Sequence, residues 1–559
     1  MYQRLRKIIF LSILFSTCSF AQDQGVFSGG FQSNANFFLR DSLIGAANIP
    51  QYDNQLFGAE AWLDLNYAVK GYSIGVRFDL FNNSNLRDPN SSYSDQGIGR
   101  YYISKQLDKL KIQVGYIYDQ IGSGIIYRAF EERPQLIDNA LVGAQVEYRI
   151  NNDWEISAFT GKQRNLFSVF ESVVKGAKVE GYYGFKEDNP LSIAPGFGIV
   201  NRTLDDETMD RVIGVAKNLI DEDRFKPTYN VYLGSIYNTL SYKSFSWYVE
   251  AAYKSQDVFN DPMADRKTLS GAVVQGRLRR DSGSVLYSSL SFAQGKLGIT
   301  VEGKRTENFN FRVDPNLSRN FGQINFLPPM NRQNTYRLTS RYSPATQDLS
   351  ELGFQVDINY RVNKKLFLNA NFSNITDLSG DLQLYREIYF SGTYKYKRLW
   401  QLLGGLQILT YNQEIYEVKP EVPLVETVVP FVDFLYKIDR KKSVRAEFQY
   451  MFIGDDKKAG AKQDYGDWAF GLIEFNMAPH WSFVVSDMYN IDPGKNSPTD
   501  ENGKKLDIHY PRFDIFYNNK SNRYGLSYVK QVEGIVCTGG ICRLEPAFSG
   551  VKFSISSTF

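Results

Sequence analysis

Alternation of apolar and polar side chains with a period of two recurs from one end of the chain to the other. Between residues 71 and 80, every second residue from Tyr72 to Leu80 is apolar, and Ser, Gly, Arg or Asp stands between them. Residues 352–362 and 444–452 repeat the pattern. Because successive side chains of a β-strand point to opposite faces, each such segment has one apolar and one polar face. The pattern predicts an all-β chain.

The connections between these segments fall into two classes that alternate along the chain. Short connections occur around Lys70 and Asp439, whereas long polar connections are expected at 162–172, 203–227, 255–282 and 306–350, among others. Short turns at one end of a two-sided sheet and long loops at the other are typical of an outer-membrane barrel. Closure of the sheet satisfies the backbone groups that an open edge would expose to lipid.

Counting the alternating segments predicts a closed antiparallel up-and-down transmembrane β-barrel of about 24 strands, within a range of about 20 to about 26. An even count returns the C-terminus to the side of the N-terminus. The first expected strand covers residues 26–39 and the last covers 550–559. Residues 139–202 leave open whether two of the segments are strands or loops.

Composition excludes several other classes of protein. The 559 residues include 40 Phe, 37 Tyr and 6 Trp, yet mean hydropathy is −0.35 and we find no apolar run long enough for a membrane-spanning helix. The 64 Lys and Arg nearly balance 61 Asp and Glu, whereas a nucleic-acid-binding surface normally has a basic excess. Two His residues leave little room for His-based catalysis or a His-rich metal site. We therefore expect no enzymatic activity, cofactor, bound metal or nucleic-acid partner.

The N-terminus has the layout of a secretory signal peptide. Arg4, Arg6 and Lys7 precede the short apolar run 8–15, and Ser19-Phe20-Ala21 provides small residues for cleavage before residue 22. We expect residues 1–21 to be removed, leaving 22–559 as a single barrel domain without a separate plug. An uncleaved membrane anchor is disfavoured because the apolar run is only about half a membrane span.

Removal of the signal peptide also removes Cys18 and leaves Cys537 and Cys542 as an even pair. In an oxidising compartment, the sequence Cys537-Thr-Gly-Gly-Ile-Cys542 predicts a small disulfide loop. Thiol redox motifs use a tighter spacing, and a zinc site needs more ligands.

Taken together, the cleavable signal, the aromatic alternation, the asymmetric loops and the final strand ending in Phe559 resemble bacterial outer-membrane β-barrel proteins. The Gln22 start and the Tyr-, Asn- and Lys-rich sequence are most similar to large barrels of Bacteroidota-type bacteria. The resemblance implies location in the Gram-negative outer membrane and contact with its lipid. It also implies that Phe559 is the signal read by the barrel-assembly machinery during insertion.

Two sets of residues are candidates for a role in the barrel. Residues 205–220 have the spacing of an amphipathic helix, which we expect either to form a lid at the mouth or to pack on neighbouring loops. Its apolar side chains are Met209, Val212, Ile213 and Leu219. The residues expected to line the lumen are Arg77, Asp79, Glu250, Glu302, Asp357, Arg361, Arg445, Glu447, Arg512 and Asp514. Because both signs occur among them, we expect no strong ion selectivity.

Two functions remain open at this point. A TonB-dependent receptor would need a folded N-terminal plug, and the first expected strand begins only a few residues after the cleavage site. The first hypothesis is a porin-like passive channel for polar solutes, with loops 119–138 and 306–350 long enough to constrict it. The alternative is a non-enzymatic scaffold that holds protein partners in an outer-membrane secretion or assembly complex.

Overall fold

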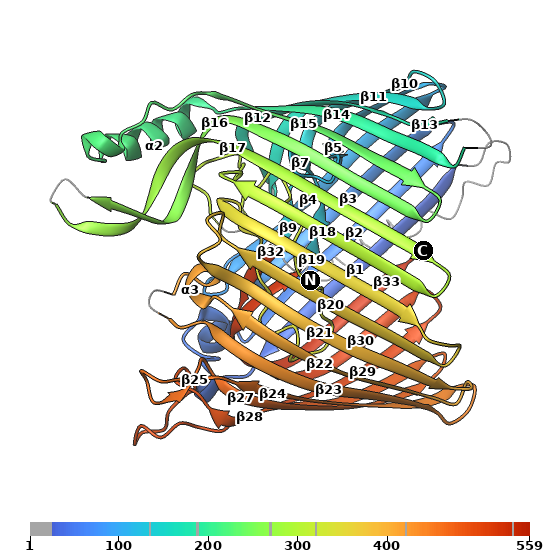
Figure 1. Ribbon diagram of the computed structural model, residues 1–559, viewed down its shortest axis with the longest axis vertical. Helices are drawn as coiled ribbons and strands as arrows, with labels where there is room; N and C mark the ends of the chain where they lie inside the picture. The colour runs from blue at the N-terminus through green and yellow to red at the C-terminus, as the bar shows by residue number, and fades with distance from the viewer. Residues whose placement is uncertain are drawn as a thin grey trace, which may run out of the picture.

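Twenty-four antiparallel strands form a closed barrel wall in the computed structural model (Figure 1). The structure describes residues 25–133, 136–185, 189–267, 271–318, 321–419, 422–538 and 541–559. The expected signal peptide, 1–21, lies outside the described residues. The wall strands are β1 (Val26–Phe38), β2 (Phe57–Val69), β3 (Tyr72–Ser84), β4 (Tyr93–Leu107), β5 (Leu110–Ile117), β10 (Leu141–Arg149), β11 (Trp154–Asn165), β12 (Ser168–Gly181), β14 (Leu191–Thr203), β15 (Asn230–Tyr242), β16 (Phe245–Lys267), β17 (Val273–Gln294), β18 (Leu297–Glu307), β19 (Ser350–Arg361), β20 (Leu366–Thr376), β21 (Gln383–Tyr396), β22 (Trp400–Tyr411), β23 (Val425–Lys437), β24 (Lys442–Ile453), β27 (Gly466–Met477), β28 (Trp481–Pro493), β29 (His509–Asn519), β30 (Asn522–Gln531) and β33 (Phe548–Thr558).

Each wall strand pairs with the next along the chain, and β33 returns to pair with β1, where Phe37 faces Val551 and Gly30 faces Thr558. The two-residue strand β13 (Tyr183–Gly184) continues the line of β12 against β14. The predicted number and order of strands are therefore confirmed, including the strands within 139–202.

The two faces of the wall have opposite chemistry, as the alternation requires. On β3, Ile74, Phe78 and Leu80 are exposed on the outer face, while Arg77 and Asp79 are buried on the inner face. The same division holds on the other wall strands, whose exposed side chains are mostly aliphatic or aromatic. Lipid, rather than a packed core, is the environment that suits such an outer face.

The two ends of the barrel differ in their connections (Figure 1). Two-residue turns such as Lys70-Gly71, both with positive φ, gather at one end, which we call the short-turn end. The opposite, long-loop end carries most of the remaining elements. These are η1 (Ser42–Ile44), η2 (Gln51–Gln55), β6 (Gln120–Ile121), β7 (Tyr127–Arg128), β8 (Glu131–Glu132), β9 (Ile137–Asp138), α2 (Asp206–Lys217), η4 (Asp221–Asp223), α3 (Gln413–Tyr416), β25 (Asp455–Asp456), β26 (Ala461–Lys462), β31 (Gly534–Thr538) and β32 (Ile541–Glu545).

The prediction of a long loop is wrong at two places. Most of 255–282 belongs to β16 and β17, which project beyond the other strands as a hairpin (Figure 1). Most of 162–172 belongs to β11 and β12, which are joined by a tight turn at residues 166 and 167. The register of the hairpin shifts between Lys254 and Asp257 and again between Asp261 and Asp265. Beyond the membrane neither face of a strand meets lipid, so the alternation that marks the wall disappears there.

The predicted amphipathic helix is present as α2. Asp205 caps it by accepting a hydrogen bond from the backbone N–H of Thr208, and Asp206 and Glu207 lie in its first turn, where carboxylates favour the helix dipole. Within the described part of the chain, helices are too short or too polar to cross a bilayer.

Candidate functional site

Two long loops fold from the long-loop end into the barrel. We call them the first inner loop, residues 118–140 between β5 and β10, and the second inner loop, residues 308–349 between β18 and β19. Their apolar side chains, among them Ile121, Ile125, Phe309 and Phe311, are fully buried against the inner face of the wall. The hydrophobic core of this protein therefore lies inside the barrel, around the loops.

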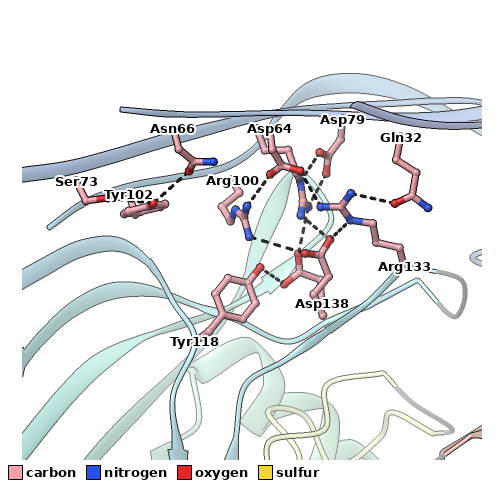
Figure 2. Close-up of polar contacts among 12 residues, drawn as sticks. Gln32, Asp64, Asn66, Ser73, Asp79, Arg100, Tyr102, Tyr118, Arg133 and Asp138 are labelled. Carbon is pink, nitrogen blue, oxygen red and sulfur yellow. Dashed lines mark hydrogen bonds and ion pairs between the residues drawn. The ribbon is translucent and has the colours of Figure 1, made fainter. Parts of the chain in front are cut away.

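The first inner loop is fixed to the wall by a network of charged side chains (Figure 2). Arg133 donates to Asp64 on β2 at 2.8 Å and to Glu131 within the loop at 2.8 Å. Arg77 on β3 bridges Asp79 at 2.6 Å and Glu131 at 2.5 Å.

The network continues on either side of these pairs. Arg100 on β4 donates to Asp64 at 2.6 Å. Asp138 of the loop pairs with Arg164 on β11 and accepts a hydrogen bond from the Tyr118 hydroxyl at 2.8 Å. Four arginines and four carboxylates are thus paired at the boundary between loop and wall.

Electrostatics favour the charged form of Glu131. Burial by itself would raise the pKa of Glu131, but the guanidinium groups of Arg77, Arg133 and Arg100 outweigh it and hold the pKa below the ordinary 4.5. Removing one partner of such a network leaves a charge in a poorly hydrated site, which is costly. The network therefore fixes the position of the first inner loop more strictly than apolar packing alone would.

The second inner loop runs along the inside of the wall from β19 towards β27, and it is bonded to a series of strands. Arg332 donates to Asn369 on β20 at 2.6 Å, and Asn334 donates to Glu387 on β21 at 2.8 Å. The Tyr336 hydroxyl donates to Asp433 on β23 at 3.2 Å. The second inner loop therefore crosses these strands as a continuous band, which we call the belt.

Farther along the belt, its contacts reach β24 and the loop before β27. The backbone N–H of Leu338 donates to Gln449 on β24 at 2.8 Å, and the Tyr342 hydroxyl donates to Asp464 at 2.6 Å. The Arg341 guanidinium lies 4.8 Å from the ring centroid of Trp468. Burial alone would raise the pKa of Asp464, but Arg341 and the Tyr342 hydroxyl lower it below the usual range.

The belt has a second side, which the wall does not cover. Gln333, Thr335 and Arg337 are exposed, although they alternate with residues that contact the wall. Side chains that point away from the wall inside a closed barrel face the remaining lumen. The inner loops thus line a solvent-accessible space that retains polar side chains.

The two inner loops also bond to each other. The backbone N–H of Arg128 donates to the carbonyl of Ile324 at 3.0 Å, and that of Phe326 donates to the carbonyl of Gly124 at 2.9 Å. The Ser123 hydroxyl donates to Glu250 on β16 at 2.7 Å. Loops from distant parts of the chain therefore form one connected structure inside the wall.

The residues expected to line the lumen all alternate with side chains that point outward, and so lie on the inner face. Arg77 and Asp79 belong to the network of the first inner loop, and Glu250 and Asp357 contact the first and second inner loops respectively. Arg445 bridges Asp433 at 2.8 Å. Glu302 accepts a hydrogen bond from Tyr287, and Glu447 accepts one from Gln449. Arg512 and Asp514 pair with each other. Arg361 is exposed near the short-turn end.

The helix α2 lies outside the lumen. Val212 is buried against Val258 and Leu278 of the projecting β16–β17 hairpin, and Met209 and Leu219 are also buried, whereas Ile213 is half-buried. In Figure 1 the helix projects beside that hairpin at the long-loop end. This placement favours a helix packed on neighbouring loops over a lid.

The structure also places Phe559, the pair Cys537 and Cys542, and His509. Phe559 continues β33, exchanging backbone hydrogen bonds with Gly29 at 2.8 and 3.0 Å, and its ring remains exposed. The backbones of Cys537 and Cys542 face each other in the β31–β32 hairpin, but their side chains lie outside the described part of the structure. His509 has a partner that the sequence did not reveal, since Nδ1 lies 2.5 Å from Asp487 Oδ2.

The anchoring residues of the inner loops were not identified from the sequence. Asp64, Arg133, Arg332 and Arg341 have no local motif, because each acts with residues far away in the chain. One signal was available: Phe309, Phe311 and Val313 alternate with polar residues within a connection expected to be polar. An apolar alternation of this kind indicates a loop with one buried side.

No curated protein matches the sequence. Among solved structures, the barrel is similar to the translocation pore of the P pilus usher PapC, with 8% identity and a TM-score of 0.42 over 96% of this chain and 99% of that chain. The siderophore receptor PirA from Pseudomonas aeruginosa gives 7% identity and a TM-score of 0.40 over 96% and 81% of the two chains. Acinetobacter baumannii OccAB4 gives 10% and 0.32 over 74% and 100%.

The expected likeness to barrels of Bacteroidota-type bacteria stays a prediction. A family model described as "Family of unknown function (DUF6029)" matches residues 1–559, the whole length of the sequence. The closed 24-stranded barrel with two inner loops is thus the structure of a member of this family, and the chain belongs to DUF6029.

Proposed function

We propose that the protein is a passive channel of the bacterial outer membrane, which conducts small polar solutes through a lumen narrowed by its two inner loops. The observation that carries the proposal is the exposed side of the second inner loop, with Gln333, Thr335 and Arg337. A loop that only filled the barrel would bury the side chains on both of its sides. A polar, solvated side favours a path for polar solutes.

The arrangement also suggests how the path is kept narrow. In a wide barrel the wall alone would leave a large aqueous opening. The second inner loop covers the inner face from β19 to β27, and the first covers the region of β2 to β4. The inner loops therefore occupy part of the cross-section of the barrel, which limits the size of the solute that can pass.

Cysteine substitution in planar bilayers tests this proposal. In a background carrying Cys537→Ser and Cys542→Ser, Arg337→Cys places a thiol on the exposed side of the belt. A bulky neutral maleimide should react with it in the reconstituted channel and lower the single-channel conductance. The matched control is Leu338→Cys, the adjacent position, whose side chain is 1% exposed. That variant should neither react in the folded barrel nor change its conductance.

Two outcomes would contradict the channel. If Arg337→Cys is fully modified and the current does not change, solutes do not pass the second inner loop. If the unmodified barrel carries no current at all, the alternative gains support, namely a non-enzymatic scaffold in an outer-membrane secretion or assembly complex. Co-purification of stoichiometric protein partners from native membranes would then identify that complex.

A further inference from the structure

The short-turn end carries a concentration of positive charge that the channel does not require. Lysines occupy six different turns at this end, and all six are exposed. We call these residues the basic rim: Lys70, Lys109, Lys243, Lys364, Lys397 and Lys520. The same six turns contain a single acidic residue, Asp108.

The excess is local to this end. The chain as a whole is almost balanced, with 64 Lys and Arg against 61 Asp and Glu. The other turns at this end add the cations Lys365, Arg398, Arg440 and Lys441 and the acidic residues Asp153 and Asp439, so the balance at this end remains positive. Clustered like charges repel one another and favour an anionic partner that neutralises them.

The geometry indicates which side of the wall this partner occupies. Lys105 Nζ lies 3.8 Å from the ring centroid of Tyr72, and Lys397 Nζ lies 5.4 Å from that of Tyr396. Lys243 Nζ lies 5.3 Å from the ring centroid of Tyr242. These tyrosines alternate with inward-facing residues and so lie on the outer, lipid-facing side of their strands. Lys243 and Lys397 of the basic rim, and Lys105 next to it, therefore lie beside the membrane surface rather than over the lumen.

The aromatic residues fix the level of the rim relative to the bilayer. Exposed Tyr67, Tyr148, Trp247, Tyr436 and Trp481 lie on the wall near the short turns. Tyr and Trp on the lipid face of a barrel mark the interface between hydrocarbon and headgroups. Lysines one or two residues beyond these interfacial aromatic side chains reach the level of the lipid phosphates.

We propose that the basic rim binds the phosphate headgroups of anionic phospholipids in the leaflet at the short-turn end. Each lysine supplies a flexible point charge, and at Lys243 and Lys397 the ring of the neighbouring tyrosine also contacts the ammonium group. Zwitterionic lipid presents the same phosphate next to a fixed cation, so it competes less well. The annulus around this end of the barrel is therefore enriched in anionic lipid.

The experiment compares lipid composition next to three forms of the full-length protein. The barrel is reconstituted into vesicles of phosphatidylcholine and phosphatidylglycerol, and spin-labelled analogues of each lipid report the fraction in contact with protein. In the rim variant the six lysines of the basic rim become asparagine. Asparagine is chosen because Lys70, Lys243, Lys397 and Lys520 have positive φ, which asparagine tolerates. A difference in gel mobility between unheated and heated samples verifies that each variant is folded.

The matched control changes six exposed lysines elsewhere, at the long-loop end: Lys217, Lys226, Lys267, Lys457, Lys458 and Lys504, all to asparagine. Wild type and control should show a several-fold preference for phosphatidylglycerol, which falls at high salt. The rim variant should lose the preference at low salt.

Several results would overturn the proposal. Equal contact of the two lipids with the wild type would mean that the rim does not select headgroups. A preference that persists in the rim variant would place the lipid site elsewhere. If the wild type shows no lipid preference but retains dextran sulfate through the rim lysines, the partner is a soluble polyanion and not the membrane.

Discussion

Arg133 Nη2 and Asp64 Oδ2 lie 2.8 Å apart, although 69 positions separate the two residues in the sequence. One belongs to the first inner loop and the other to β2 of the wall. The same carboxylate also accepts from Arg100 on β4. This contact makes the position of the loop dependent on β2 and β4, the two strands that flank β3.

Breaking this contact should destabilise the barrel. Both side chains are partly solvated, at 21% and 15% exposure, so we expect Arg133→Gln or Asp64→Asn to lower the free energy of unfolding by about 1–3 kcal/mol. The double variant should cost less than the sum of the two single changes, because the charges interact directly. Denaturant titration in lipid vesicles measures the free energy of unfolding of the wild type, the two single variants and the double variant. Strict additivity would show that the contact contributes nothing.

Acid should release both inner loops. The pKa values of Glu131 and Asp464 are lowered in the folded state by facing arginines that outweigh burial. The folded state thus binds these protons more weakly than the unfolded chain, so the stabilisation is complete above the ordinary carboxyl pKa and is lost as the pH falls through the lowered value. We expect conductance to be constant near neutral pH and to rise below about pH 4. In Glu131→Gln the transition should be weaker, since one of the two groups no longer titrates.

Cys537 and Cys542 should form a disulfide. Their backbones are directly opposed across the two-stranded β31–β32 hairpin, and opposed positions bring Cβ atoms close enough for a bond. A maleimide applied to intact cells should label neither residue until a reductant is added. Immediate labelling at both positions would show free thiols.

Helix α2 should contribute little to the conductance. Its apolar side packs on the β16–β17 hairpin, and Arg211 reaches the second inner loop only at Asp314, 3.0 Å away. Replacing residues 205–220 with a Gly/Ser linker should therefore leave the single-channel conductance unchanged while exposing Val258 and Leu278. A clear rise in conductance would instead support a lid.

The strands of the wall could be predicted from the sequence because lipid requires apolar side chains on one face of each strand. On β19, Leu352, Phe354 and Ile358 must face hydrocarbon, and Gln355 and Asp357 must not, so the alternation marks the strand directly. The rule stops where the membrane stops. This is why residues 255–282, whose strands continue in water beside α2, were interpreted as a loop.

The interior could be predicted only in outline. The lengths of 119–138 and 306–350 indicated constriction, but the anchors depend on contacts such as Tyr342 with Asp464, 122 positions apart. No periodicity links residues at such distances, because the contact is set by the curvature of the closed wall. The charges of the lumen were identified by alternation, whereas their pairing with the loops was not.

Single-channel recording of the wild type beside a variant with a shortened second inner loop tests the central claim most directly. In the variant, residues 331–343 are replaced by a short Gly/Ser linker, which removes Arg332, Tyr336 and Arg341 from the wall; shortening the exposed connection 500–504 is the control. If the inner loops narrow a conducting lumen, the wild type gives small, steady currents, the variant gives larger ones, and the control matches the wild type. A wild type without current, together with a variant that also remains silent, would contradict the channel.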